Sequence, residues 1–324
     1  MSEKNFDIVI IGAGPAGLSA AIEAAKSNLS FCVIEKGSIV NSIQYFPAGM
    51  TFFSTPELLE IGELPFTSAK MRPTRTEGLE YYTRVAEYYK LNLKLFEKVV
   101  SLKKKSELFE ITTSKDIYRT RFVIIATGYY DNPNLLGIPG EELSKVSHFY
   151  NEPYQFFHQK VLVIGAKNSA AIAALELFRH GAEVTLVHRG SSLSEKIKYW
   201  ILPDLQNRIK EGSITAYFNT TVEQIELDKV HLKTDRHQFS IENDIVFALT
   251  GYHPDYEFLR TSGIELDNET FAPLLQNNFF ETNVNGIFVA GSIVAGKNNN
   301  SIFIENGRMH GREIISEIVK RILK

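Results

Sequence analysis

A glycine-rich turn between an apolar strand and an alanine-rich helix constrains this chain more than any other feature. Phe6–Ile11 is mostly apolar and leads into the hexapeptide GAGPAG at residues 12–17. Leu18–Ser27 then has apolar residues at helical spacing, and Phe31–Ile34 is apolar again. This order of strand, tight turn, helix and strand predicts a βαβ unit with two parallel strands.

The same pattern occurs a second time later in the chain. Val161–Ile164 is an apolar strand, GAKNSA at residues 165–170 is the turn, and Ala171–Arg179 has the period of a helix. Glu183–Val187 supplies the second strand. The sequence therefore predicts two mononucleotide-type βαβ units and an α/β fold.

Segments that alternate apolar and polar residues follow each of these units. Each group predicts a small antiparallel meander. A buried strand and a Thr-Gly turn close each group, as FVIIATG at residues 122–128 and IVFALTG at residues 245–251. The meander strands are expected at Val99–Leu102, Leu108–Thr112 and Asp116–Arg119, and again at Thr221–Leu227, Lys229–Lys233 and Gln238–Ile241.

The repeat is longer than a motif and covers whole domains. Residues 286–291 add one more strand after it, and residues 302–323 predict a closing amphipathic helix. We therefore expect one Rossmann-like domain built from residues 1–130 and 251–324, with residues 131–250 inserted as a second. Turn residues mark the two hinges, at Asn132, Pro133, Pro139 and Gly140 and at Gly251, His253 and Pro254.

Composition excludes several classes of protein. Cys32 is the only cysteine, which excludes an intramolecular disulfide, a CxxC redox pair, a thiolate zinc site and a cysteine-ligated iron–sulfur cluster. It lies in the apolar strand Phe31–Ile34, where we expect a buried and unreactive side chain. A net charge of −3 gives no global field that would attract nucleic acid.

Targeting and metal signals are also missing from the sequence. The apolar runs are far shorter than the ~20 residues that span a bilayer, and no basic region with a cleavage site precedes the first strand. We therefore expect a cytoplasmic protein that binds no membrane. The eight histidines have no HExxH or paired ligand spacing, so no metal is expected.

The first glycine turn fits the pyrophosphate of a dinucleotide. Gly12 permits the tight turn, Gly14 leaves room for the pyrophosphate, and Gly17 allows the helix to pack on the strand. Glu35 follows the second strand, where its carboxylate can accept both hydrogen bonds of a ribose diol.

The second turn has a different residue pair at the corresponding place. His188 and Arg189 follow its second strand, where a carboxylate would select an unphosphorylated ribose. Two donor groups fit a 2′-phosphate instead, so the sequence favours NADPH over NADH, with a solvated strand end as the alternative. Lys167 adds a positive charge near the phosphates or is simply solvated.

Two dinucleotide sites in one chain are typical of a bound redox cofactor with a diffusible hydride donor, here FAD and NADPH. Over essentially its full length the sequence resembles the two-dinucleotide-binding flavoproteins of the thioredoxin-reductase-like group. The motifs that carry the resemblance are GAGPAG at 12–17, ATG at 126–128, LTG at 249–251 and VAG at 289–291, which fall in that group's order.

A closer resemblance is to the subgroup of bacillithiol-disulfide reductases. It implies an NADPH-dependent FAD oxidoreductase that passes electrons to a small acceptor, a low-molecular-weight disulfide such as bacillithiol disulfide. The stretches that carry it are Asn41–Ile43, Met50–Gly62, Lys70–Arg75, Gly165–Ala170, Lys198–Asp204 and Ile302–Arg308.

Two residues depart from the family pattern. The subgroup commonly has a cysteine, its proposed redox thiol, where this chain has Ala16. The wider group has an acidic residue after the late glycine, where this chain has Ser292. Without a thiol at position 16, we expect generic acceptors to be reduced and bacillithiol disulfide to be reduced slowly or not at all.

The predicted site contains cofactor-binding residues only, and no catalytic residue or metal ligand is assigned. By the turns and the resemblance together, FAD contacts are expected from Gly12, Gly14, Pro15, Ala16, Gly17, Glu35, Lys36, Ser42, Gln44, Thr51, Val100, Ala126, Thr127, Gly128, Gly291, Ser292, Ser301 and Ile302. The start of the closing helix, at 301–303, is expected to point N–H groups at the flavin. NADPH contacts are expected from Gly165, Lys167, Asn168, Ser169, Ala170, His188, Arg189, Thr250 and Gly251.

Other functions remain open at this stage. A ferredoxin or flavodoxin–NADP reductase or a diaphorase would use the same cofactors, although the former usually has an added C-terminal segment. A monooxygenase would need a linker fingerprint that residues 147–150 do not supply. A redox-sensing module would bind FAD and NADPH without turnover. We expect a homo-oligomer whose substrate is a small molecule.

Overall fold

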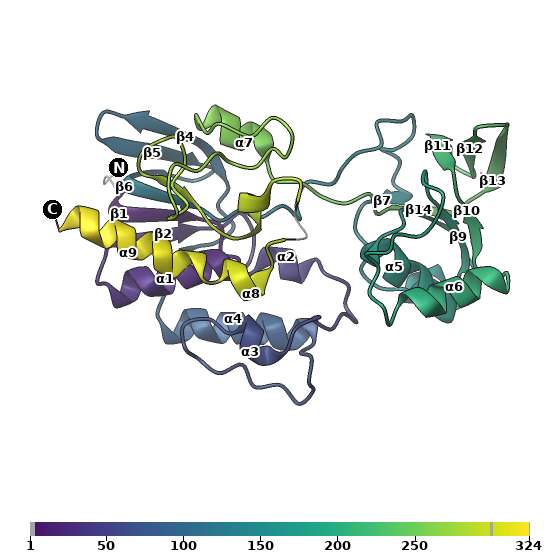
Figure 1. Ribbon diagram of the computed structural model, residues 1–324, viewed down its shortest axis with the longest axis horizontal. Helices are drawn as coiled ribbons and strands as arrows, with labels where there is room; N and C mark the ends of the chain where they lie inside the picture. The colour runs from purple at the N-terminus through teal and green to yellow at the C-terminus, as the bar shows by residue number, and fades with distance from the viewer. Residues whose placement is uncertain (1–3, 299–300, 324) are drawn as a thin grey trace. The chain divides into compact units, whose positions relative to one another are not determined.

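The computed structural model describes residues 4–298 and 301–323, and the chain forms two compact units (Figure 1). Unit 1 contains Met1–Tyr45, Gly49–Asn132 and Tyr252–Lys324, and unit 2 contains Phe46–Ala48 and Pro133–Gly251. None of the helices in the described ranges is both long and apolar enough to cross a membrane.

Unit 1 is built on a seven-stranded mixed sheet. Its parallel part has the order β3, β2, β1, β6, β15, and two further strands, β4 and β5, continue the sheet antiparallel along the first half of β6. The strands are β1 (Lys4–Ile11), β2 (Phe31–Ile34), β3 (Leu93–Lys94), β4 (Val99–Lys105), β5 (Leu108–Thr113), β6 (Ile117–Ile125) and β15 (Ile287–Val289).

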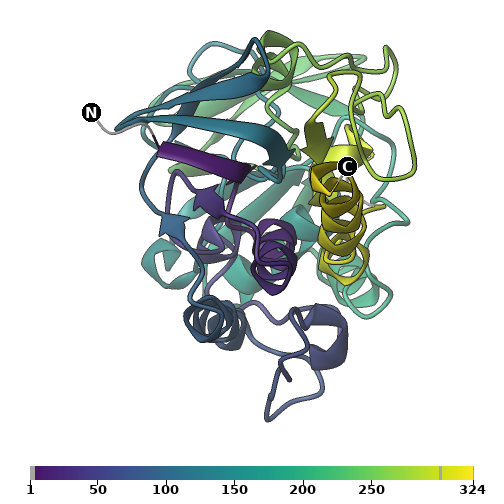
Figure 2. The same ribbon diagram turned by 90° about the vertical axis from the view of Figure 1, so that its left-hand side faces the viewer.

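Two helices lie side by side on one face of this sheet (Figure 2). They are α1 (Pro15–Lys26) and α9 (His310–Ile322). Gly311 makes their close approach possible, because a Cβ there would lie 2.6 Å from the backbone nitrogen of Ala20. The last four residues of β1 and of β6 are apolar and buried, as expected for parallel strands covered on both faces, whereas the first halves of these strands contain charged and polar residues.

Shorter elements complete unit 1. They are α2 (Asn41–Gln44), α3 (Pro56–Leu59), α4 (Arg75–Tyr88), α7 (Tyr256–Thr261), α8 (Ile304–Gly307) and the 3-10 helix η2 (Gly291–Ala295). The prediction of one closing helix over 302–323 was wrong, because α8 and α9 are separate. Met309 N–H bonds to Asn306 O, three residues back, and this tighter turn interrupts the helix.

Unit 2 repeats the parallel order of unit 1 in a five-stranded sheet, β10, β9, β8, β14, β7. A separate three-stranded antiparallel sheet contains β11, β12 and β13. The elements are β7 (Val146–Ser147), η1 (Tyr154–Phe156), β8 (Lys160–Ile164), α5 (Asn168–Arg179), β9 (Glu183–Val187), α6 (Leu202–Lys210), β10 (Thr215–Tyr217), β11 (Thr220–Ile225), β12 (Lys229–Thr234), β13 (Gln238–Glu242) and β14 (Ile245–Ala248).

Both predicted βαβ units and both meanders are present. One difference concerns β6, which is a single strand where the sequence suggested a meander strand followed by a separate buried strand. A second is β7, whose two residues are too few to give an alternating pattern.

Candidate cofactor and active site

The first glycine turn forms a cradle with one open position. A Cβ on Gly12 would lie 2.5 Å from Ala126 O, and a Cβ on Gly17 would lie 2.0 Å from Gly12 O. A Cβ on Gly14 would have no neighbour within 4 Å. Two glycines therefore allow protein packing, and the third leaves free space, which is where a pyrophosphate approaches the backbone.

Hydrogen bonds fix this turn from both sides. Ala13 N–H donates to Glu35 Oε2 at 2.8 Å, and Gly37 N–H donates to Glu35 Oε1 at 2.9 Å. Val40 N–H donates to Ala13 O at 3.0 Å. Each carboxylate oxygen keeps a lone pair that can accept from a ribose hydroxyl. Burial raises the pKa of Glu35, and the two backbone N–H groups partly offset this effect.

The residues that hold the turn and α2 in place could not be found from the sequence pattern. Val40 has φ of 47°, which is rare for a β-branched residue. Its N–H bonds to Ala13 O in the glycine turn. Arg75 donates from Nε to Ile43 O at 3.1 Å and also bonds to Gln44 O. These bonds fix α2, which contains the predicted FAD residues Ser42 and Gln44.

The start of α1 is a suitable anion site. Gly14 is its N-cap with no side-chain cap, Pro15 is at its first turn, and no acidic residue lies there. The exposed N–H groups and the helix dipole therefore favour a negative group. Thr127 Oγ1 is buried with no hydrogen-bond partner, which is the kind of orphaned donor that a bound group satisfies.

Ala16 packs against the late glycine. A Cβ on Gly291 would lie 2.8 Å from Ala16 Cβ, and a Cβ on Gly307 would lie 3.2 Å from Gly291 Cα. Three segments of unit 1 therefore meet at small residues. Ser292 follows in η2, and its hydroxyl is 3.7 Å from the Cβ position of Gly128.

His310 supports this contact and was not identified from the sequence. Its Nδ1 accepts from Gly291 N–H at 3.2 Å, and its ring stacks on Phe280 with centroids 4.0 Å apart. Burial lowers the pKa of His310 to about 4, so the imidazole is neutral at neutral pH. It therefore acts as an uncharged acceptor that fixes the late glycine turn.

A second arginine, Arg308, holds the segment around α3, which follows the predicted FAD residue Thr51. Arg308 Nη1 donates to Glu57 O at 2.9 Å and bonds to Glu60 O, so it caps the end of α3. Ser54 bonds to Glu305, which ties residues 51–55 to α8. The resemblance covered both segments, but nothing in their pattern indicated these bonds.

The remaining predicted FAD residues lie in unit 1 with mixed surroundings. Lys36 Nζ pairs with Asp131 Oδ2 at 3.0 Å, so its charge is already partnered. Thr51 is exposed and Val100 is 61% exposed on β4. Ser301 donates to Asn298 O at 2.8 Å, and Ile302 is half-buried. Their cofactor roles stay predictions.

The second glycine turn has similar backbone geometry. A Cβ on Gly165 would lie 2.6 Å from Leu249 O, and φ there is 137°. Lys167 is the exposed N-cap of α5, which has no side-chain cap and no acidic residue in its first turn. Ser169 is exposed and Ala170 is buried. This helix start also suits an anion.

Other predicted NADPH residues already have protein partners. Asn168 Oδ1 accepts from Lys198 N–H at 2.9 Å, and its Nδ2 donates to Lys196 O at 3.2 Å. Thr250 Oγ1 donates to Asn134 O at 2.5 Å, next to Gly251. These two side chains therefore shape the loops around the turn.

His188 and Arg189 lie at the end of β9, as predicted. Arg189 is exposed and His188 is half-buried. Burial first, and then the charges of Arg189 and Lys167, lower the pKa of His188. A neutral His188 can still donate one hydrogen bond to a phosphate, and Arg189 supplies the charge.

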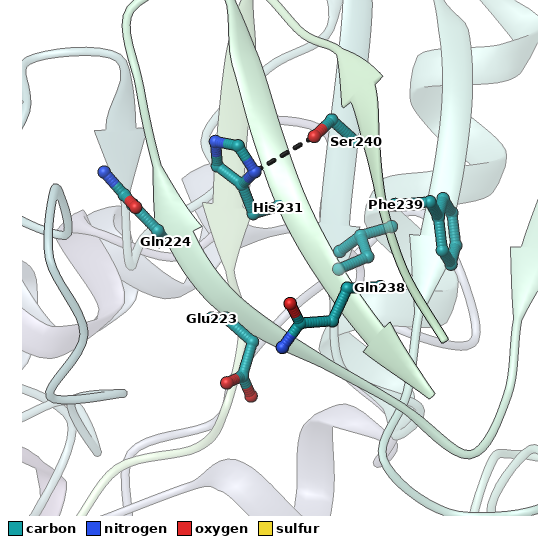
Figure 3. A pocket seen from close by; sticks show the side chains of 7 residues that line it. Glu223, Gln224, His231, Gln238, Phe239 and Ser240 are labelled. Carbon is teal, nitrogen blue, oxygen red and sulfur yellow. Dashed lines mark hydrogen bonds between the residues drawn. The ribbon is translucent and has the colours of Figure 1, made fainter. Parts of the chain in front are cut away.

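A hollow of about 280 Å³ lies on the three-stranded sheet of unit 2 (Figure 3). Within it, the Ser240 hydroxyl is 3.0 Å from His231 Nδ1. His231 Nε2 is 2.6 Å from Oε1 of Glu226, which does not line the hollow. No predicted cofactor residue lines this hollow. In residues 4–298 and 301–323, no three His, Cys, Asp or Glu side chains are grouped to hold a metal ion.

The two glycine turns, each between parallel strands and a helix of its own unit, define a Rossmann-like α/β oxidoreductase with two dinucleotide sites. The chain belongs to the pyridine nucleotide-disulphide oxidoreductase family, whose profile matches residues 9–291. It is 47% identical over 315 residues, 97% of both chains, to bacilliredoxin reductase Bdr of Bacillus subtilis.

Solved structures agree with this assignment. Bacillithiol disulfide reductase Bdr from Bacillus cereus superposes with a TM-score of 0.96 at 43% identity, covering 98% of this chain and 100% of that one. Thioredoxin reductase from T. acidophilum superposes with a TM-score of 0.75 at 25% identity, covering 99% of this chain and 100% of that one. The predicted fold class and family resemblance are therefore confirmed, and the cofactors are FAD and NADPH.

Proposed function

We propose that this chain oxidises NADPH and reduces a small-molecule disulfide, bacillithiol disulfide. The observation that carries the proposal is the identity of 47% along 97% of a bacilliredoxin reductase, together with the TM-score of 0.96 to a bacillithiol disulfide reductase. The cradle at Gly14 and the cationic end of β9 supply the dinucleotide sites that this reaction needs.

Each unit is assigned one cofactor. Residues 1–130 and 251–324 would hold FAD, with the α1 N-terminus on the pyrophosphate and Glu35 on the ribose. Residues 131–250 would hold NADPH, with His188 and Arg189 on the 2′-phosphate. When bound, the flavin accepts a hydride and supplies two electrons to the next acceptor.

The net reaction consumes NADPH, one proton and one disulfide and yields NADP⁺ and two thiols. The S–S bond breaks, and the two electrons come from the hydride of NADPH. Cys32 contributes no thiolate, because it is 0% exposed and burial raises its pKa to about 12. The disulfide step therefore proceeds without a mixed disulfide on the protein, and we expect it to be slow.

Ala16 favours a second candidate function. A chain without a thiol near the late glycine turn is better suited to acceptors that take electrons directly, such as quinones, dyes or a ferredoxin. In that case the enzyme is a diaphorase or a ferredoxin-type NADP reductase.

An acceptor comparison separates the two candidates. Purified holoprotein is mixed with NADPH and either bacillithiol disulfide or a quinone, and NADPH loss and thiol release are measured together. Two thiols released per NADPH support the proposed function. Quinone reduction without any thiol release contradicts it and supports the second candidate.

The setting of the protein is proposed with the function. A lone buried cysteine suits a reducing cytoplasm. We also propose that the protein forms a homo-oligomer and binds no nucleic acid, because its net charge is −3.

A further inference from the structure

Two exposed aromatic side chains lie in the loop that follows β9. Tyr199 is 78% exposed and Trp200 is 39% exposed, with ring centroids 4.8 Å apart in an edge-on arrangement. They belong to the segment Lys198–Asp204, which the family resemblance singled out and the proposed chemistry does not use. Adjacent exposed aromatics of this size often mark a binding surface.

Hydrogen bonds attach this loop directly to the second glycine turn. Ser194 N–H donates to Ala166 O at 3.0 Å. Asn168, the first residue of α5, binds the loop through Lys196 O and Lys198 N–H. Ile197 is 3% exposed and anchors the loop in the core of unit 2. The aromatic pair is therefore held beside the helix start that would take the pyrophosphate.

The charges of this region suit a polyanionic ligand. Lys196 is exposed and Lys198 is half-buried, and both lie close to Asn168. Lys167 and Arg189 supply further positive charge on the turn and at the end of β9. Cationic and aromatic groups together match a dinucleotide, which combines phosphates with flat rings.

We propose that the loop 194–200 is part of the NADPH site and that Tyr199 and Trp200 pack against the bound dinucleotide. This inference rests on the proposed NADPH role of the second glycine turn. Asn168 is then a positioning residue, since it binds the loop rather than the ligand.

Trp200 makes this inference directly measurable, because it is the only tryptophan in the chain. Holoprotein is titrated with NADP⁺ while tryptophan fluorescence is recorded, and the dissociation constant is measured in parallel by calorimetry. We expect a saturable fluorescence change with the same Kd by both methods. Unchanged fluorescence at a concentration that calorimetry shows to be saturating would overturn the inference.

A matched pair of variants tests the contact energetically. Tyr199→Ala should raise the Kd for NADP⁺ by about 5- to 10-fold, because one aromatic face is lost. The control is Tyr154→Ala, since Tyr154 is 69% exposed in the same unit but contacts His180 at the far end of α5. Equal Kd values for Tyr199→Ala and the wild type would overturn the inference. If calorimetry detects no NADP⁺ binding to the wild type, the proposed function fails as well.

Discussion

The two units share a parallel strand order but join their meanders to it differently. In unit 1, β6 runs unbroken from Ile117 to Ile125, so meander and parallel strands form one sheet. In unit 2, β13 ends at Glu242 and β14 begins at Ile245. Asn243 lies between them and donates to Lys160 O at 3.1 Å and Ile245 O at 2.7 Å. Asn243 therefore marks the point at which the two sheets of unit 2 separate, whereas β6 has no such interruption.

The cofactor sites of the two units also differ, in how deeply the residues around the glycine turn are buried. In unit 1, the glycine turn is enclosed by Glu35, which is 8% exposed, and by Val40, which is 1% exposed. In unit 2, the residues that follow β9 are the half-buried His188 and the exposed Arg189, and the turn itself carries the exposed Lys167. We infer that unit 1 retains its dinucleotide and that unit 2 exchanges its own. Four substitutions or pH changes can break or sharpen this contrast.

The largest effect is expected for Gly14→Val. The backbone there has φ of −72°, and a Cβ has no neighbour within 4 Å, so unit 1 should still fold. The side chain would fill the space that the pyrophosphate needs, and we expect the purified variant to be colourless. Flavin absorbance measures the bound FAD of the variant, and circular dichroism shows whether it is folded. A folded variant with full flavin content would contradict the placement of the pyrophosphate at Gly14.

Next in size is the effect of removing a buried ion pair of unit 1. Arg321 binds Glu281 with two bonds of 2.6 and 2.7 Å, and Glu281 is 3% exposed. Arg321→Ala removes the cationic partner of this carboxylate and leaves it with two neutral donors, Gly286 N–H and Asn277 Nδ2, so it should lower the free energy of unfolding by about 3 kcal/mol.

The control for this variant lies in unit 2. Arg208 pairs with Asp204 at 3.3 Å on the surface of α6, and Arg208→Ala should cost less than about 1 kcal/mol. Thermal and denaturant unfolding measure the loss of free energy of unfolding in both variants. Equal losses for the two variants would show that burial does not distinguish the pairs.

The third prediction concerns acid pH. The pKa of His310 is about 4 in the folded unit and about 6.5 when unfolded, so only the unfolded chain gains a proton between these values. The contribution of His310 to the free energy of unfolding is therefore constant above about pH 6.5 and falls by up to about 3 kcal/mol as the pH drops to 4. Unfolding curves across this range measure the loss.

His310→Gln tests whether His310 causes this loss of stability, since glutamine keeps a hydrogen-bond acceptor but does not titrate. The loss between pH 6.5 and 4 should shrink in this variant. His188→Gln should change it less, because His188 is half-exposed. A loss that is the same in His310→Gln as in the wild type would assign it to another group.

The smallest of these effects is expected at Arg189. Arg189→Ala removes the phosphate contact and should lower kcat/KM for NADPH by roughly 10- to 100-fold, while kcat/KM for NADH should change little. Arg236→Ala, in the exposed turn between β12 and β13, serves as the control. Equal losses for both nucleotides would reject the 2′-phosphate role.

Much of the fold could be predicted because it follows from local patterns. Apolar strands, glycine turns and helical spacing predicted both βαβ units, and the alternation of apolar and polar residues predicted both meanders. The break between α8 and α9 could not be predicted, because Arg308 and Met309 continue a helical pattern while the hydrogen bonds shift from four to three residues back.

The site was predictable only where backbone geometry is set by residue type. Gly12, Gly14 and Gly17 follow from the turn that the chain must make. Arg75 and His310 could not be predicted, because each acts by bonding a backbone atom more than fifteen residues away in sequence, at Ile43 O and at Gly291 N. Such bonds leave no periodic or spacing signal.

We expect disulfide reduction here to be slow because no protein thiol takes part in it, and variants at Ala16 test this expectation most directly. Thiol release from bacillithiol disulfide is compared among the wild type, Ala16→Cys and Cys32→Ser, with quinone reduction as the control in each. We expect Ala16→Cys to raise thiol release while quinone reduction stays nearly unchanged, and Cys32→Ser to match the wild type, because only a thiolate at position 16 can form the mixed disulfide. Thiol release as fast in the wild type as in Ala16→Cys, or a loss of thiol release in Cys32→Ser, would contradict the account.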